Sequence, residues 1–69
     1  MNIIMGRPEV NKIVGMTISE AILHLDKYNL ILRTTVYNGK SLMVSGDIDM
    51  NRVNVFVENN IIVDIDKLG

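Results

Sequence analysis

The residues best suited to chemistry are four oxygen-bearing side chains at the spacing of a calcium loop. Positions one, three, five and twelve, which are ligand positions in an EF-hand, are occupied by Asp47, Asp49, Asn51 and Glu58. Position six must be glycine for the sharp turn, but Arg52 stands there and would put a positive charge beside the cation. Residues 53–58 also alternate like a strand, which would carry Glu58 far from Asp47. We therefore reject a calcium site and interpret the acidic residues as part of a solvated loop.

Other arrangements that could support catalysis are no stronger. Asp64 and Asp66 fall on one face of the predicted last strand, where alternating acids usually favour solubility and oppose edge pairing. His24 has no neighbouring ligand and is interpreted as a structural histidine. No nucleophile–base set, glycine-rich phosphate loop or metal-ligand spacing is visible in the sequence. The sequence therefore predicts a protein that is not an enzyme, with neither a metal nor a cofactor.

Composition and charge limit the classes of partner. The 69 residues, 48% hydrophobic and 22% charged, are typical of one small globular domain, and no cysteine is present for a disulfide. Seven basic and eight acidic residues give a net charge of −1 without a basic cluster, so we expect no nucleic-acid binding. No apolar run approaches the ~20 residues that cross a bilayer, so no membrane contact is expected. Without a visible signal peptide, we expect a cytoplasmic monomer, or a secreted one if a leader was removed.

One helix has a clear start signal. Thr17 and Glu20, in T-I-S-E, form a capping box in which each side chain can satisfy a free backbone N–H near the other residue. The apolar residues that follow at helical spacing are Ile18, Ala21, Ile22 and Leu25. Leu23 lies opposite this stripe and is expected to be exposed. The helix is predicted to end near residues 28–29, since Asn29 tolerates the left-handed conformation common after a last turn.

Three further segments predict strands. Residues 30–37 are rich in β-branched and aromatic side chains and end at Asn38-Gly39, which is also a hairpin signal. A tight turn into residues 40–44 therefore competes with an uninterrupted polar connection over residues 38–51. Residues 52–58 alternate, with Val53, Val55 and Val57 toward the core and Arg52, Asn54 and Phe56 on the other face. After a turn at Asn59-Asn60, residues 61–66 predict a last strand at the sheet edge.

These elements predict an α+β fold in which one α-helix packs on a small mixed β-sheet with a long exposed loop. A single domain spans residues 1–69, and residues 1–12 form a lead-in that can be mobile. Connections longer than ~12 residues are usually functional or disordered, which draws attention to residues 38–51.

Four separated pieces of the chain carry a family resemblance. I-V-G-M-T-I-S-E-A at residues 13–21 is similar to the pattern L-V-G-x-[ST]-x-x-E-A. V-S-G-D-I-D-M-N-R-V-N-V-F-V at residues 44–57 is similar to V-T-x-[DE]-x-R-x-[ND]-R-V-R-[LV]-F-V. E-N-N-I-I at residues 58–62 falls at the turn before the last strand, and I-D-K-L-G ends the chain as the short tail of the pattern does. Together these pieces resemble the potato inhibitor I family of serine-protease inhibitors, which includes barley chymotrypsin inhibitor and eglin, and its fungal and bacterial elastase and subtilisin inhibitors.

The resemblance implies a serine-protease inhibitor whose substrate-like, preorganised loop, about residues 43–49, enters the protease active site. Gly46 and Asp47 would flank the reactive bond, and the other loop residues that match binding positions are Val44, Ser45, Ile48 and Asp49. Arg52 matches a supporting arginine expected to bond Asp47 and Ser45. Asn54 replaces a second supporting arginine, as in the fungal and bacterial relatives.

Departures from the family pattern leave alternatives open. Gly46 replaces a large apolar residue and can fill no specificity pocket, so subtilisin-like or elastase-like proteases are the favoured partners. Asp49 stands where arginine is usual, and the tryptophan expected before Pro8-Glu9 is absent. The segment is longer than usual in the family, so Met43-Val44 is an alternative reactive bond. A non-inhibitory interaction domain on the same scaffold is the alternative function, and Gly46 favours it.

Overall fold

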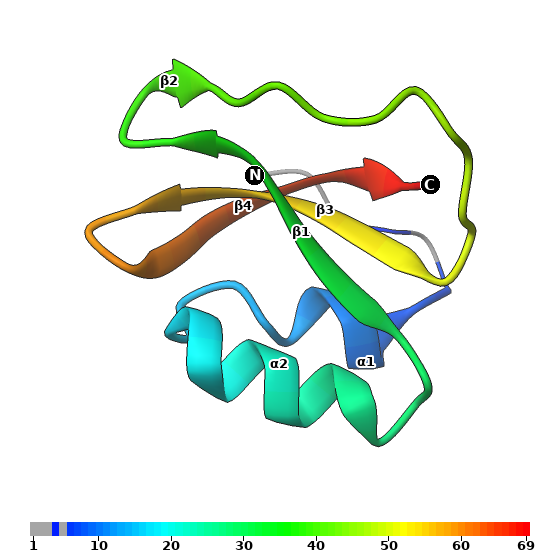
Figure 1. The fold of residues 1–69 in the computed structure, drawn as a ribbon. Coiled ribbons are helices and arrows are strands. Elements are labelled where there is room, and N and C mark those ends of the chain that lie inside the picture. Colours follow the sequence, from blue (N-terminus) through cyan, green and yellow to red (C-terminus); the bar gives the residue numbers. More distant parts are fainter. Residues whose placement is uncertain (1–3, 5) are drawn as a thin grey trace.

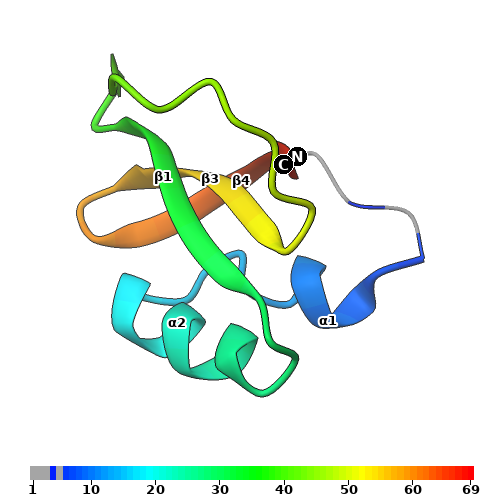
Figure 2. The same ribbon diagram turned by 45° about the vertical axis from the view of Figure 1, so that its right-hand side comes forward.

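Residue 4 and residues 6–69 are described by the computed structural model, which arranges them in three layers (Figure 1). Helices α1 (Pro8–Asn11) and α2 (Ile18–Asp26) cover one face of a sheet. Its strands are β1 (Ile31–Tyr37), β2 (Lys40–Ser41), β3 (Arg52–Glu58) and β4 (Ile61–Leu68). Residues 42–51, called the loop below, run along the opposite face from β2 to β3, and the turned view in Figure 2 preserves this layering. The prediction of an α+β fold with a mixed sheet is confirmed; α1 was not predicted, and β2 belongs to the hairpin that residues 40–44 left as an alternative.

The sheet order is β2-β1-β3-β4, with β1 and β3 parallel and the two outer pairs antiparallel. The last strand therefore lies at an edge, as predicted. The parallel register places Arg33 of β1 opposite Asn54 of β3. Because these residues are distant in sequence, only the folded sheet makes them neighbours.

The start of α2 follows from its capping box. The backbone N–H of Glu20 donates to Thr17 Oγ1 at 3.2 Å, and the backbone N–H of Thr17 donates to Glu20 Oε1 at 2.9 Å. The bond from the Thr17 backbone N–H, followed by one from the Thr17 side chain, holds the pKa of the Glu20 carboxyl below its usual value. The helix ends at Asp26, earlier than predicted, and Asn29 then adopts a left-handed φ of 57°. Ile22 was expected in the apolar stripe but is 50% exposed, because α2 turns mainly Ala21 and Leu25 toward the sheet.

The core lies between the helices and the inner face of β3. Val53, Val55 and Val57 are fully buried there, as predicted. The other buried apolar residues are Val10, Ile13, Ala21, Leu25, Leu30, Ile62 and Ile65. Val10 belongs to α1, within the predicted lead-in, of which residues 1–3 and 5 lie outside the described residues. The buried residues of this core are thus all aliphatic.

Two asparagine turns set the strand connections. Asn38 and Gly39 have φ of 49° and 80°, the paired positive values of a type I′ hairpin turn between β1 and β2. The hairpin therefore forms in preference to an uninterrupted connection, and it shortens the irregular segment to the loop. Asn59 and Asn60, with φ of 50° and 67°, make the predicted turn between β3 and β4.

Candidate functional site

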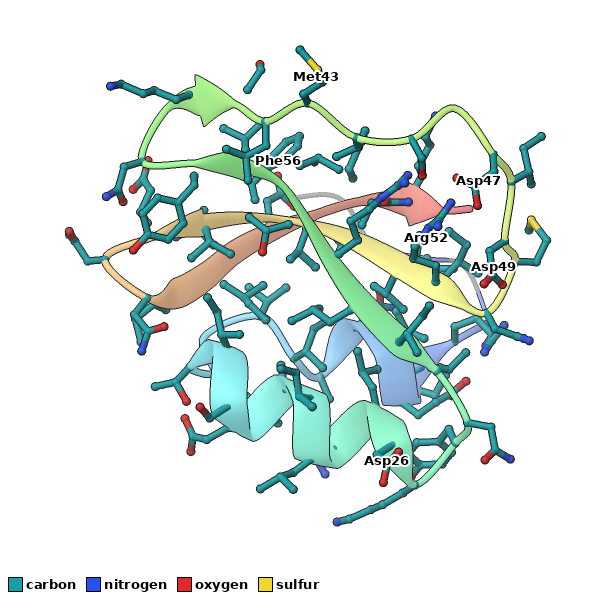
Figure 3. The ribbon with its side chains drawn as sticks, in the orientation of Figure 1. Asp26, Met43, Asp47, Asp49, Arg52 and Phe56 are labelled. Carbon is teal, nitrogen blue, oxygen red and sulfur yellow. The ribbon has the colours of Figure 1, made fainter. Side chains whose placement is uncertain are left out.

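The loop exposes an unusual amount of apolar side chain. Its exposed apolar residues are Leu42, Met43, Val44, Ile48 and Met50. Met43 is fully exposed and points away from the ribbon in Figure 3, and Ile48 is 82% exposed. A solvated connection would normally carry polar side chains at such positions, and exposed apolar side chains grouped on one segment are typical of interaction surfaces.

Arg52, the first residue of β3, holds the loop through its side chain. Its Nη2 donates to the main-chain oxygen of Asp47 at 2.9 Å, and its Nη1 donates to Asp47 Oδ2 at 3.3 Å. Figure 3 shows the Arg52 side chain directed at Asp47. Arg52 is only 9% exposed, which rules out a freely solvated charge at a strand start. Its Nε is buried and has no hydrogen-bond partner within the described part of the chain.

A second arginine, which the sequence analysis missed, holds the other side of Gly46. Arg33 Nη1 donates to both the main-chain oxygen and Oγ of Ser45, each at 3.3 Å. Ser45 was expected to bond Arg52, but the structure shows it bonded to Arg33. It lies on β1, whereas the family pattern places both supporting residues on the strand that follows the loop. The only local signal was a charged residue inside the apolar run L-I-L-R-T-T-V-Y.

Asn54 orients Arg33 and joins the network to the end of the described chain. Its Oδ1 accepts from Arg33 Nε at 2.7 Å, and its Nδ2 donates to the main-chain oxygens of Lys67 at 3.1 Å and Gly69 at 3.0 Å. The Gly69 oxygen also accepts from Arg33 Nη2 at 3.3 Å and Arg52 Nη2 at 3.4 Å. Asn54 is fully buried, and all these partners satisfy it. We call Arg33, Arg52 and Asn54 the polar clamp.

Within the loop, Ser45 and Asp47 also bond each other, since Ser45 Oγ donates to Asp47 Oδ1. This bond, followed by the bond from Arg52, holds the pKa of the Asp47 carboxyl below its usual value of 3.8. Asp47 therefore carries its negative charge at neutral pH and accepts from both donors. Residues 45–47, called the anchored segment below, are thus fixed on both sides of Gly46.

Gly46 itself has no structural need to be glycine. All five glycines are described, and Gly46 alone among them lies outside the positive-φ region. A Cβ built on Gly46 meets no heavy atom within 4 Å. A larger side chain would therefore project into open space without backbone strain.

The remaining acidic residues of the loop serve its return to β3. Asp49 Oδ1 accepts from the Asn51 backbone N–H at 2.9 Å, and the Asp49 main-chain oxygen accepts from the Arg52 N–H at 3.0 Å. Glu58 lies at the opposite end of β3. Over residues 4 and 6–69, no three His, Cys, Asp or Glu side chains gather as a metal site would require.

A hollow of about 510 Å³ lies between the loop and the outer face of the sheet. Its lining includes Val44, Ser45 and Gly46 from the loop and Arg33, Thr35 and Asn54 from the sheet. The loop is therefore held above the sheet by the polar clamp and not by continuous packing. No helix in the described ranges is long and apolar enough to cross a membrane.

The structure thus brings together Ser45, Gly46, Asp47, Arg52 and Asn54 from the predicted site, and adds Arg33. Met43, Val44 and Ile48 lie on the same loop but outside this network. Comparisons with family models, curated proteins and solved structures found no match to the chain.

Proposed function

We propose that this protein is a serine-protease inhibitor that presents a substrate-like loop, about residues 43–49, to the protease active site. One observation carries the proposal. The main-chain oxygens of Ser45 and Asp47, on either side of the Gly46-Asp47 bond, each accept from a guanidinium rooted in the sheet. Proteases bind substrates in extended form, so a loop already held in position loses little conformational entropy on binding.

The same contacts would make cleavage reversible. Hydrolysis of the Gly46-Asp47 bond would leave Gly46 attached to Ser45, which Arg33 holds, and Asp47 in contact with Arg52. Charge-assisted hydrogen bonds are stronger than neutral ones, so both new ends would stay near each other. Religation would then compete with release, and the protease would remain occupied.

The favoured targets are subtilisin-like or elastase-like proteases. Gly46 presents no side chain to a deep specificity pocket, so affinity must come from the backbone and from flanking side chains. The exposed Ile48, beyond the reactive bond, and Val44, before it, supply apolar contacts. The target is therefore a protease that accepts glycine before the cut bond.

The second candidate is an interaction domain that binds a partner through the loop without inhibiting a protease. Gly46 favours it, because the fold does not require glycine there and an inhibitor would gain from a larger residue. The exposed side chains of Met43 and Ile48 would then contact another protein surface.

An inhibition assay on a panel of subtilisin-like and elastase-like proteases separates the two candidate functions. We expect at least one protease to be inhibited stoichiometrically, with mass spectrometry locating a single slow cut at Gly46-Asp47. A catalytically inactivated sample of the same protease serves as the binding control. Rapid turnover of the chain as a plain substrate by every member would reject the inhibitor and leave the interaction domain.

A further inference from the structure

We propose that the Met43-Val44 bond is a separate protease site at which cleavage inactivates the protein. Proteases with a deep apolar specificity pocket would cut there and destroy the loop, whereas proteases that accept glycine would be inhibited at Gly46-Asp47. This inference rests on the proposed function above. It assigns opposite outcomes to two bonds of one loop.

Met43 is the residue of the loop best presented to a deep apolar pocket. Its side chain is fully exposed and points away from the rest of the molecule (Figure 3). Methionine is unbranched and flexible, so it can enter an apolar pocket with little steric restriction. Val44 contributes to the hollow beneath the loop, but Met43 does not, so no packing holds Met43 in place.

The Met43-Val44 bond also lies outside the polar clamp. Within residues 4 and 6–69, no side chain donates a hydrogen bond to Met43 or Val44, and the bonds from Arg33 and Arg52 to the loop begin at Ser45. On the amino side, the nearest contact is the Leu42 N–H donating to the Thr35 oxygen at 2.8 Å. That contact is a single neutral bond, whereas Ser45 accepts two bonds from the Arg33 guanidinium.

The distance from each contact to the cut end also differs. One residue's pair of backbone torsions separates the Gly46 carbonyl carbon from the held carbonyl of Ser45. The backbone torsions of two residues separate the Met43 carbonyl carbon from the nitrogen of Leu42, which is held by its hydrogen bond. The end created at Met43 therefore has more freedom to leave.

Hydrolysis at Met43-Val44 adds one water across the peptide C–N bond. Met43 becomes a carboxylate, and Val44 becomes a protonated amine that takes up the proton released. Because the Met43 carboxylate is no longer held opposite that amine, the reverse reaction would be too slow to compete with departure of the fragment end. The anchored segment would then lose its covalent link to β2, so only the contacts of the polar clamp would oppose its displacement from the extended form when a protease binds.

Positions 43 and 46 allow a matched exchange. Gly46 has open space and ordinary φ, and Met43 is fully exposed with no positive φ, so neither substitution strains the fold. The set comprises the wild type, Met43→Gly, Gly46→Met and the double exchange, which keeps the composition unchanged. Each is incubated with a chymotrypsin-like protease that has a deep apolar pocket and with a glycine-accepting subtilisin-like protease.

With the chymotrypsin-like protease, we expect a wild-type cut at Met43-Val44, loss of inhibitory activity, and at least about 100-fold slower cutting there in Met43→Gly. The double exchange should instead inhibit that protease stoichiometrically. Purified wild type nicked at Met43-Val44 should not regenerate intact chain with fresh protease. Either regeneration, or a wild type left uncut at Met43-Val44, overturns the inference. Failure of the proposed function gives a different result, namely that the subtilisin-like protease is not inhibited. Mass spectrometry locates the cut with both proteases, so the two failures are distinguished.

Discussion

The two faces of β3 are stabilised in different ways. The inner face buries Val53, Val55 and Val57 among aliphatic side chains, where contacts are many and individually weak. The outer face buries Arg52 and Asn54, each with a few directional partners on other segments. Loss of one inner contact should therefore lower the stability of the whole fold, whereas loss of one outer contact should first release the loop.

The largest effect is expected from a polar side chain on the inner face. Val55→Asn would remove a buried valine and leave an amide without partners, at a cost of about 3–5 kcal/mol. For a domain of this size, that lowers the melting temperature by about 4–8 °C per kcal/mol. Thermal and urea unfolding measure it. A loss below about 1 kcal/mol would show that the inner face is less tightly packed than the buried valines indicate.

The reciprocal substitution on the outer face should lower the free energy of unfolding less, but it should also loosen the loop. Asn54→Val leaves Arg33 Nε and the main-chain oxygens of Lys67 and Gly69 each short of one partner, at a cost of about 1–3 kcal/mol. Since Arg33 then loses its orientation, limited proteolysis at Gly46-Asp47 should accelerate. Unfolding curves and cleavage rates are compared with those of Val55→Asn. A stability loss without faster loop cleavage would remove Asn54 from the loop support.

The sequence predicted the inner face far better than the outer one. The capping box at Thr17 and Glu20 and the alternating valines are local signals, readable within a few residues. The pairing of Arg33 with Asn54 depends instead on the parallel register of β1 and β3, which no local pattern encodes. Ile22 was misplaced for a related reason, because the face of α2 that packs is set by the sheet beneath it.

The next effect concerns the two arginines that hold the loop, Arg33 and Arg52. Arg52→Ala should leave the protein folded, yet speed hydrolysis within residues 44–49 about 10-fold or more, because charged hydrogen bonds of roughly 1.5–3 kcal/mol each no longer hold the loop. Arg33→Ala should do the same from the Ser45 side. Arg7→Ala is the matched control, since Arg7 pairs with Glu9 away from the loop. Unchanged cleavage kinetics in both clamp variants would mean that the clamp does not restrain the loop.

The smallest expected effect concerns the charge of Asp47, the point where the outer face meets the loop. Because the pKa of the Asp47 carboxyl is lowered in the fold, the contacts of its carboxylate stabilise the loop above pH 3.8 and are lost as the pH falls from there through the lowered pKa. Ser45→Ala should raise the Asp47 pKa more than Arg52→Ala, since the hydroxyl bond is the larger cause. A carboxyl NMR titration of the wild type and both variants measures this order. If Arg52→Ala gave the larger rise, the arginine would hold the loop chiefly through the Asp47 carboxylate. The expected order instead leaves Arg52 to hold the loop chiefly through the Asp47 main-chain oxygen, a contact that persists when the carboxyl is protonated.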